Sequence, residues 1–164
     1  MKNLYIDFDG VIMDTINKTY EMMDEENIDR KNNEEVKKFY ENIDWKRLLK
    51  ETKEINGAIE KVKKLNDSSK FNVAILAHVN SLEEAVEKVR FIRKFYDDIT
   101  VITVPKAISK TKMVHTKNAI LVDDYTGNLV EWRSEDGIGI KFSTTPKQSE
   151  FKVIDDLDKI FELF

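Results

Sequence analysis

The sequence contains no cysteine among its 164 residues and has only two prolines and two histidines. A chain without cysteine forms no disulfide, has no thiolate nucleophile and cannot bind zinc through sulfur. It also lacks any apolar run of the ~18 residues needed to span a bilayer. The first strand-like run begins at Leu4, which leaves no room for a signal peptide. Together these absences predict a cytoplasmic protein that does not bind membranes.

The charges show no strong bias toward one sign. The chain has 27 Lys and Arg against 31 Asp and Glu, which gives a net charge of −4. Strong binding to nucleic acid depends on many cationic contacts to phosphates, so this balance argues against it. An anionic substrate would need a local site, because the overall field does not attract it. The length suits one domain with a modest insertion.

Short apolar runs that alternate with helical patterns define the fold class. Five runs are expected to be strands, and they cover residues 4–8, 71–77, 99–104, 119–122 and 137–142. The middle three are almost continuously apolar, which is typical of parallel strands covered on both faces. Helical patterns cover residues 55–65, 82–93, 128–134 and 153–164. The alternation predicts an α/β fold with a Rossmann-like, doubly wound parallel sheet of about five strands.

Residues 15–53 interrupt the alternation with helical periodicity alone. We therefore predict a core domain made of residues 1–14 and 54–164, with a small helical cap, residues 15–53, inserted after the first strand. Three aromatic residues of the cap, Phe39, Tyr40 and Trp45, have two interpretations. They either offer a stacking face to a base or a sugar, or form the small apolar core of the cap itself.

Two aspartates one residue apart stand where the first strand is expected to end. Residues 5–11 read Tyr-Ile-Asp-Phe-Asp-Gly-Val, so that Asp7 and Asp9 precede Gly10, which lets the backbone turn sharply. In open α/β sheets, ligands bind outside the carboxyl ends of the strands. An Asp-x-Asp-Gly sequence on its own is more typical of a turn or a helix start.

A second acidic pair, Asp123 and Asp124, follows the fourth expected strand. If the first and fourth strands are neighbours, these carboxylates converge with Asp7 and Asp9. Two unit charges ~4 Å apart repel by ~4 kcal/mol at an effective dielectric constant of ~20, so such a cluster needs protons or a cation. Hard oxygen ligands favour Mg²⁺. The sequence therefore predicts a magnesium site on Asp7, Asp9, Asp123 and Asp124.

These motifs resemble those of the haloacid dehalogenase superfamily of phosphohydrolases. Residues 7–11 match its first motif, Asp-x-Asp-Gly-[Val/Thr], and Asp123-Asp124 matches its acidic fourth motif. Residues 121–132 and 137–142 look more narrowly like the cytosolic 5′(3′)-deoxyribonucleotidase branch. The resemblance implies a magnesium-dependent phosphomonoester hydrolase that acts through an aspartyl-phosphate. It also implies a small phosphorylated substrate, with a nucleoside monophosphate as the leading candidate.

The resemblance also implies roles for single residues. Asp7 would be the nucleophile and Asp9 the general acid and base. The metal would be held by Asp7, the Asp9 carbonyl and one or both of Asp123 and Asp124. A lysine before the fourth strand would steady the phosphate, and the spacing of three residues to Met113 favours Lys110. The other candidates for that lysine are Lys106, Lys112 and Lys117.

One expected residue is missing, because the second motif requires Ser or Thr directly after the second strand. The sequence has Ala77 or His78 there, depending on where the strand ends. His78, Asn80 or a backbone N–H could donate to the phosphate instead, which makes the predicted substrate-binding residues Gly10, His78, Asn80 and Lys110. The alternative is a catalytically weakened phosphate-binding or regulatory relative. An acidic receiver-like module is a third interpretation, but receivers carry their phosphoacceptor on a later strand.

Overall fold

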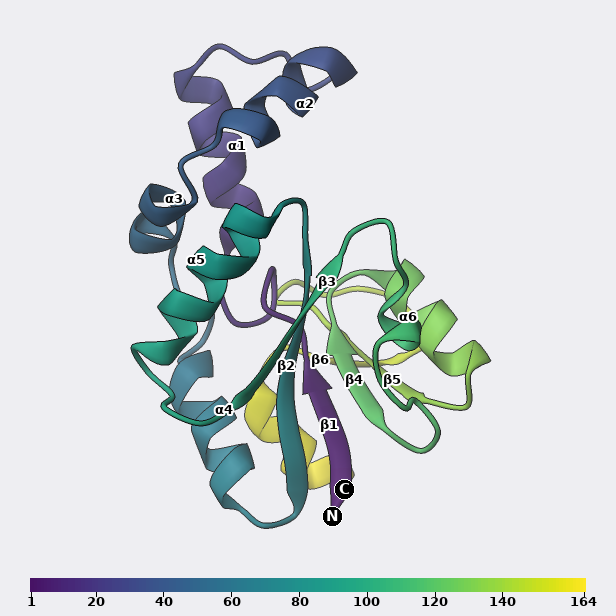
Figure 1. The fold of residues 1–164 in the computed structure, drawn as a ribbon. Coiled ribbons are helices and arrows are strands. Elements are labelled where there is room, and N and C mark those ends of the chain that lie inside the picture. Colours follow the sequence, from purple (N-terminus) through teal and green to yellow (C-terminus); the bar gives the residue numbers. More distant parts are fainter.

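A six-stranded parallel sheet forms the centre of the protein in the computed structural model, which describes residues 1–164 (Figure 1). The strand order is β3-β2-β1-β4-β5-β6, and every neighbouring pair is parallel. The strands are β1 (Lys2–Ile6), β2 (Phe71–Val79), β3 (Thr100–Pro105), β4 (Ile120–Asp123), β5 (Ile138–Phe142) and β6 (Lys152–Ile154). The predicted doubly wound α/β fold is confirmed.

The first strand lies in the middle of the sheet, with Leu4 and Ile6 in the main apolar cluster on one face and Tyr5 packed against a second apolar cluster on the other. Leu4 and Ile6 are fully buried, and Ile6 is in register with Ile75 of β2 and Val122 of β4. The chain crosses from β1 to β2 and β3 on one side, and returns to β4 on the other. The carboxyl ends of β1 and β4 therefore form the topological switch point of the sheet, where ligands bind in open α/β folds.

The sixth strand corrects the sequence prediction of a continuous helix over residues 153–164. Val153 of β6 pairs with Lys141 of β5, and β-branched residues such as Val153 and Ile154 favour a strand when a sheet edge is free to receive them. The helical part begins later, with the 3-10 turn η2 (Leu157–Lys159) and then α7 (Ile160–Leu163). Asp156 starts that turn by accepting a hydrogen bond from the Asp158 N–H.

Helices cover both faces of the sheet. One face is covered by α4 (Ala58–Asp67), α5 (Leu82–Arg93) and α7, whose Val62, Ile92 and Ile160 belong to the main apolar cluster. The other face is covered by α6 (Thr126–Ser134), where Leu129 and Trp132 belong to a second cluster. None of the helices is long and apolar enough to cross a membrane.

The buried face of α5 differs from the one that its apolar residues suggested. The sequence pattern of Leu82, Val86 and Val89 correctly predicted a helix, and Ser81 begins it by accepting a hydrogen bond from the Glu84 N–H. Leu82, however, is 81% exposed. The residues that face the protein interior are Glu84, Ala85, Lys88 and Ile92. Two charged side chains are therefore buried on this helix, and they reappear in the site below.

The predicted cap segment holds three helices: α1 (Thr15–Glu25), α2 (Asn33–Asn42) and α3 (Trp45–Glu51). Asn32 and Asp44 begin α2 and α3 with side-chain hydrogen bonds to backbone N–H groups. In Figure 1, α1 rises from the carboxyl edge of the sheet, and α3 lies beside α5. Phe39 and Trp45 are buried in the main apolar cluster, which supports the interpretation that the cap aromatics form a core. The domain boundaries themselves stay a prediction.

Candidate active site

The switch point brings the two acidic motifs together. Asp7 directly follows β1, and its backbone N–H donates to the Val122 carbonyl at 2.9 Å, which ties it to the end of β4. Asp123 is the last residue of that strand and is fully buried. One carboxylate oxygen from each of Asp7, Asp123 and Asp124 lies within 4.8 Å of the others. Three of the four predicted metal-binding aspartates thus form one cluster.

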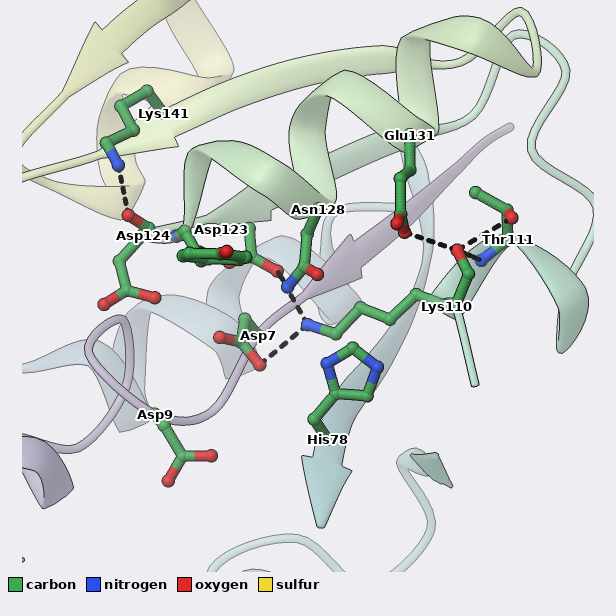
Figure 2. A network of polar contacts seen from close by, with 12 residues as sticks. Asp7, Asp9, His78, Lys110, Thr111, Asp123, Asp124, Asn128, Glu131 and Lys141 are labelled. Atoms are coloured by element: carbon green, nitrogen blue, oxygen red, sulfur yellow. Dashed lines mark hydrogen bonds and ion pairs between the residues drawn. The ribbon is translucent and has the colours of Figure 1, made fainter. Parts of the chain in front are cut away.

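Lys110 connects the two strands at this cluster (Figure 2). Its Nζ lies 2.9 Å from Asp7 Oδ1 and 2.7 Å from Asp123 Oδ2, and the residue is only 2% exposed. The short 3-10 turn η1 (Lys110–Lys112) places it there, and Ser109 begins that turn. Lys112 instead pairs with Glu135 on the surface. Of the lysines that the sequence left open, Lys110 is the one that contacts the aspartates.

Asp123 and Asp124 differ in how many of their oxygens are free. Both Asp123 oxygens are engaged, Oδ1 by the Tyr125 N–H at 2.8 Å and Oδ2 by Lys110 and by Asn128 Nδ2 at 2.9 Å. The Asp124 carboxylate forms no hydrogen bond within the protein, and it packs so closely on Gly10 that a Cβ there would lie 2.1 Å from Asp124 Oδ2. Asp124 is therefore the carboxylate of this pair with oxygens available to a cation.

Burial and mutual repulsion make the charged forms of these carboxylates unfavourable. Burial raises the pKa of Asp7 well above its usual value, and the charge of Asp123 adds to the effect, although Lys110 opposes it. Burial, followed by the charges of Asp123 and Asp9, raises the pKa of Asp124 to about 6. Lys110 alone does not balance the cluster. The free oxygens of Asp7 and Asp124 are hard donors that fit a divalent cation such as Mg²⁺.

The Asp9 carboxylate is held apart from this cluster, and Figure 2 shows it away from Lys110. Its Oδ1 accepts a hydrogen bond from Thr15 Oγ1 at 2.6 Å, and its Oδ2 lies 2.6 Å from Lys88 Nζ. The side chain still lines the same cavity as Asp7. The Asp9 carboxylate therefore stands apart from the cluster formed by the other three aspartates.

The predicted substrate-binding residues lie around the cluster in different ways. His78 faces the site, and its Nε2 donates to the Ile108 carbonyl at 2.8 Å. Burial lowers the pKa of His78, and the nearby Lys110 charge acts in the same direction. Asn80 lines the cavity, while its side chain donates to Glu84. Gly10 has a positive φ of 76°, and its role is to make the turn and to admit Asp124.

The two candidate positions of the missing hydroxyl have different surroundings. Ala77 is 1% exposed and belongs to the main apolar cluster, on the face of the sheet covered by α4, α5 and α7. His78, the next residue, lines the cavity that contains Asp7. Because alternate residues of a strand point to opposite faces, a hydroxyl at position 77 would point into the core. Strand β2 runs on to Val79, further than the sequence predicted, and of the two candidate positions only His78 lines the cavity.

The site opens into two adjoining cavities. One, of about 250 Å³, is lined by both Asp7 and Asp9. The other, of about 480 Å³, extends along the loop after β3 to Glu131. Both cavities are lined by His78, Lys106, Tyr125 and Asn128. Tyr125 is 65% exposed, so an aromatic ring stands free at the mouth. The pair offers room for a small polar substrate beside the aspartates.

Sequence reasoning missed several residues that shape the site. Lys141 of β5 donates to the Asp124 carbonyl and to Thr126 Oγ1, which fixes the turn that carries Asp124. Lys88 of α5 pairs with Asp9, which lies in the turn after β1. The sequence held one indication of this pair: at helical spacing, Lys88 lies on the same face of the helix as Ala85 and Ile92, which are small or apolar. Lysine at a core-facing position is rarely buried without a partner.

Comparison with known proteins places the fold. A scan against protein-family models finds no match, and a search of curated proteins finds none. Solved structures do match over nearly the whole chain. A haloacid dehalogenase (HAD)-superfamily hydrolase of subfamily IA from Geobacter sulfurreducens superposes with a TM-score of 0.67 at 15% identity, covering 100% of both chains.

Two further structures agree. A HAD-hydrolase from Bacillus subtilis bound to magnesium has a TM-score of 0.63 at 14% identity, covering 99% of this chain and 97% of the other. The D,D-heptose 1,7-bisphosphate phosphatase from Burkholderia thailandensis has a TM-score of 0.55 at 13% identity, with coverage of 99% and 97%. These similarities do not single out the deoxyribonucleotidase branch. The chain has the fold of the HAD-superfamily hydrolases.

Proposed function

We propose that the protein is a magnesium-dependent phosphomonoester hydrolase that acts through an aspartyl-phosphate on Asp7. The observation that carries the proposal is the buried Lys110, which bridges Asp7 and Asp123 at the ends of β1 and β4 while Asp124 keeps its oxygens free. An unbalanced carboxylate cluster at this edge of the sheet has no structural benefit for the apo protein. It does fit the binding of a cation and a phosphate.

In the first half-reaction, Asp7 attacks the phosphorus. Its Oδ1 is held by Lys110, so Oδ2 is the oxygen with a free lone pair for attack. The new Asp7 O–P bond forms as the bond from phosphorus to the ester oxygen breaks. The departing oxygen takes a proton from Asp9, which lines the same cavity. The leaving alcohol then departs through the mouth beside Tyr125.

In the second half-reaction, water attacks the phosphorus of the aspartyl-phosphate. Asp9, now ionised, takes one proton from that water, and the bond between Asp7 and phosphorus breaks. The products are inorganic phosphate and the restored Asp7 carboxylate, with Asp9 protonated for the next cycle. Lys110 holds Asp7 in one orientation throughout, and it attracts the phosphate as a point charge.

Asp7, the Asp9 carbonyl and Asp124 would hold the magnesium ion. Asp124 has both oxygens free, and Asp7 Oδ1 keeps a second lone pair for the ion beside Lys110 while Oδ2 attacks. Both oxygens of Asp123 already accept hydrogen bonds from Lys110, Asn128 and a backbone N–H. Bound Mg²⁺ would neutralise charge on the phosphate and orient it for in-line attack. Asp123 would not bind the ion, and its contact with Lys110 would orient that lysine.

The substrate proposed is a small phosphate ester, and a nucleoside monophosphate is the finer candidate. Phe39 and Trp45 are buried, and the partly buried Tyr40 packs against both, which disfavours a stacking face on the cap. The exposed ring of Tyr125 at the mouth supports a planar leaving group instead. Sugar phosphates belong in the same test, since one protein of similar fold is a heptose bisphosphate phosphatase.

The test is a hydrolysis assay with 4-nitrophenyl phosphate, nucleoside monophosphates and sugar phosphates, with Mg²⁺ and with EDTA. Turnover that requires Mg²⁺ and is absent in Asp7→Asn supports the proposed enzyme class. A preference of tenfold or more in kcat/KM for nucleotides over sugar phosphates supports the finer candidate. The opposite preference would contradict a nucleotide substrate but would still support the phosphatase activity.

A second candidate is a phosphate-binding relative that has lost turnover. The observation that favours it is His78, which stands where a hydroxyl donor is expected. A carbonyl oxygen only accepts, so the Nε2 proton of His78 is used on Ile108, and the neutral ring has no further proton to donate. Magnesium-dependent binding of inorganic phosphate without hydrolysis of any ester in the panel would establish this candidate.

Replacing His78 by threonine should raise turnover. A hydroxyl at this position restores a donor to a phosphate oxygen, and a single such donor contributes on the order of 10²-fold to the rate. We expect kcat of His78→Thr to rise about tenfold or more. Ala77→Thr is the matched control, because its hydroxyl would point into the core and should give no gain. Equal behaviour of the two variants would contradict the assignment of position 78.

Magnesium dependence should change with pH through Asp124. Protons compete with Mg²⁺ for this carboxylate, whose pKa is raised to about 6. At limiting Mg²⁺, kcat/KM should fall as the pH drops below about 6, and a tenfold higher Mg²⁺ concentration should shift that decline to lower pH. The raised pKa favours the folded apo protein at acid pH, and this contribution is lost as the pH rises through about 6.

Thermal unfolding tests the same assignment without turnover. Asp124→Asn should raise the Tm of the protein in EDTA at pH 7.5 by roughly 2–4 °C, the shift that about 1 kcal/mol gives in a chain of this size. The variant should also lose the Tm increase that Mg²⁺ gives to the wild type. A full Mg²⁺ shift in Asp124→Asn would contradict its role as a ligand.

A further inference from the structure

A buried ion-pair network on α5 lies outside the chemistry described so far. Lys88 is 0% exposed, and its Nζ lies 2.6 Å from Asp9 Oδ2 and 2.8 Å from Glu84 Oε1. A third contact, at 3.3 Å, is to the His78 carbonyl. An ammonium group has three donors. All three are therefore used, and Lys88 has one defined orientation.

The network is anchored at its far end. Glu84 is also buried, and its Oε2 accepts hydrogen bonds from the backbone N–H and the side chain of Asn80, directly after β2. The rings of Phe8 and Trp45 pack over the ammonium, with centroids 5.5 and 6.0 Å from Nζ. Helix α5, the end of β2 and the cap helix α3 together fix where this cation lies.

Asp9 is consequently held from two sides. Lys88 holds Oδ2 from the core domain, and the Thr15 hydroxyl holds Oδ1 from the first residue of the cap. An ammonium only donates, so Oδ2 stays an acceptor whether or not Asp9 carries a proton. A hydroxyl both donates and accepts, so Oδ1 is the oxygen that can gain and lose a proton without losing its partner.

We propose that Lys88 is a positioning residue for proton transfer, which holds Asp9 so that Oδ1 exchanges the proton with the leaving oxygen and with water. The inference rests on the proposed hydrolase function and adds to it a residue on α5 that touches neither phosphate nor metal. Burial of two charges on one helix is weak evidence for a purely stabilising role, because replacing a buried ion pair by apolar residues of similar volume is often neutral or stabilising.

The leaving group separates positioning from a merely structural role. An alkyl alcohol needs a proton to depart, whereas 4-nitrophenol departs readily as its anion. Lys88→Met should lower kcat/KM for an alkyl phosphate by about 10²-fold, the usual contribution of general acid catalysis, and for 4-nitrophenyl phosphate by less than about fivefold. Asp9→Asn should show the same contrast. In the double variant Asp9→Asn/Lys88→Met, kcat/KM should fall no further than in Asp9→Asn alone.

The controls address folding. Arg90→Met removes a cation from the exposed side of the same helix, where Arg90 pairs with Glu87, and should leave the ratio of the two substrates unchanged. Lys88→Met leaves Glu84 buried without a cation, so Glu84→Gln/Lys88→Met is made in parallel and should show the same contrast. Thermal unfolding of each variant shows whether it is folded at the assay temperature.

Four results overturn the proposal. Equal losses for both substrates, or additive losses with Asp9→Asn, would show that Lys88 supports only the fold. Failure of both Lys88 variants to fold would show the same. A wild-type protein that hydrolyses neither ester overturns the proposed function and this inference with it, and that result is distinguishable because it appears before any variant is made.

Discussion

Asp7→Asn should reduce kcat by at least about 10⁴-fold for every substrate that the wild type hydrolyses. Removal of a covalent nucleophile eliminates the route through the aspartyl-phosphate, whatever the leaving group. The amide keeps the size of the side chain and the backbone N–H bond to Val122, so the site keeps its shape. Steady-state assays with Mg²⁺, with detection low enough to measure a 10⁴-fold loss, provide the measurement.

The same substitution should stabilise the protein in the absence of metal. Burial and the charge of Asp123 raise the pKa of Asp7, so its ionised form is unfavourable in the folded state at neutral pH. The neutral amide removes that cost, and Tm in EDTA at pH 7.5 should rise by roughly 2–4 °C. Asp14→Asn is a suitable control, since Asp14 forms a side-chain hydrogen bond only with Asn17. An active or destabilised Asp7→Asn would contradict the assignment of Asp7.

Lys110→Met should impair both activity and stability. Lys110 is the only cation in contact with Asp7 and Asp123, and without it two buried carboxylates face each other. Loss of one partner of a buried ion pair costs about 3 kcal/mol, which corresponds to a decrease of roughly 6–12 °C in Tm. The loss of charge stabilisation at the phosphate should lower kcat by about 10²- to 10³-fold.

Lys112→Met, two residues away, is the matched control. Its side chain is mostly exposed and pairs with Glu135 on the surface, so its removal should change stability by less than about 0.5 kcal/mol and leave kcat unchanged. Activity assays and thermal unfolding of both variants test the choice between the two lysines. Similar effects in the two variants would mean that Lys110 does not serve the site.

The sequence was sufficient to predict the elements that carry a strong local pattern. The apolar runs gave β1 to β5, because strands buried on both faces have few polar residues. The strand-end positions of Asp7 and Asp123 then predicted a cluster, since parallel strands end at the same edge. Lys110 was favoured by its spacing to Met113. The contact with both aspartates agrees with that choice, although its chemical role awaits the variants above.

The features that sequence analysis missed depend on contacts between distant segments. Val153 and Ile154 form a strand only because β5 offers a free edge. The local sequence pattern cannot show that edge, and it predicted a helix instead. The buried face of α5 was misjudged because Lys88 and Glu84 neutralise each other inside the protein. The network is completed by Asp9, which lies 79 positions away from Lys88 in the sequence. A sequence pattern predicts that charged residues are exposed unless the partners that neutralise them are known.

The cap and the core domain bury their apolar side chains together. Met23 of α1 and Leu48 of α3 belong to the same cluster as Ile6 of β1 and Val62 of α4. Segments that share one core lose their hydrogen-exchange protection together, so the amides of α3 and of α5 should open in one cooperative step. Excision of residues 15–53 would uncover an apolar face and produce an aggregating chain. We therefore expect the smallest folding unit of this protein to include residues 15–53.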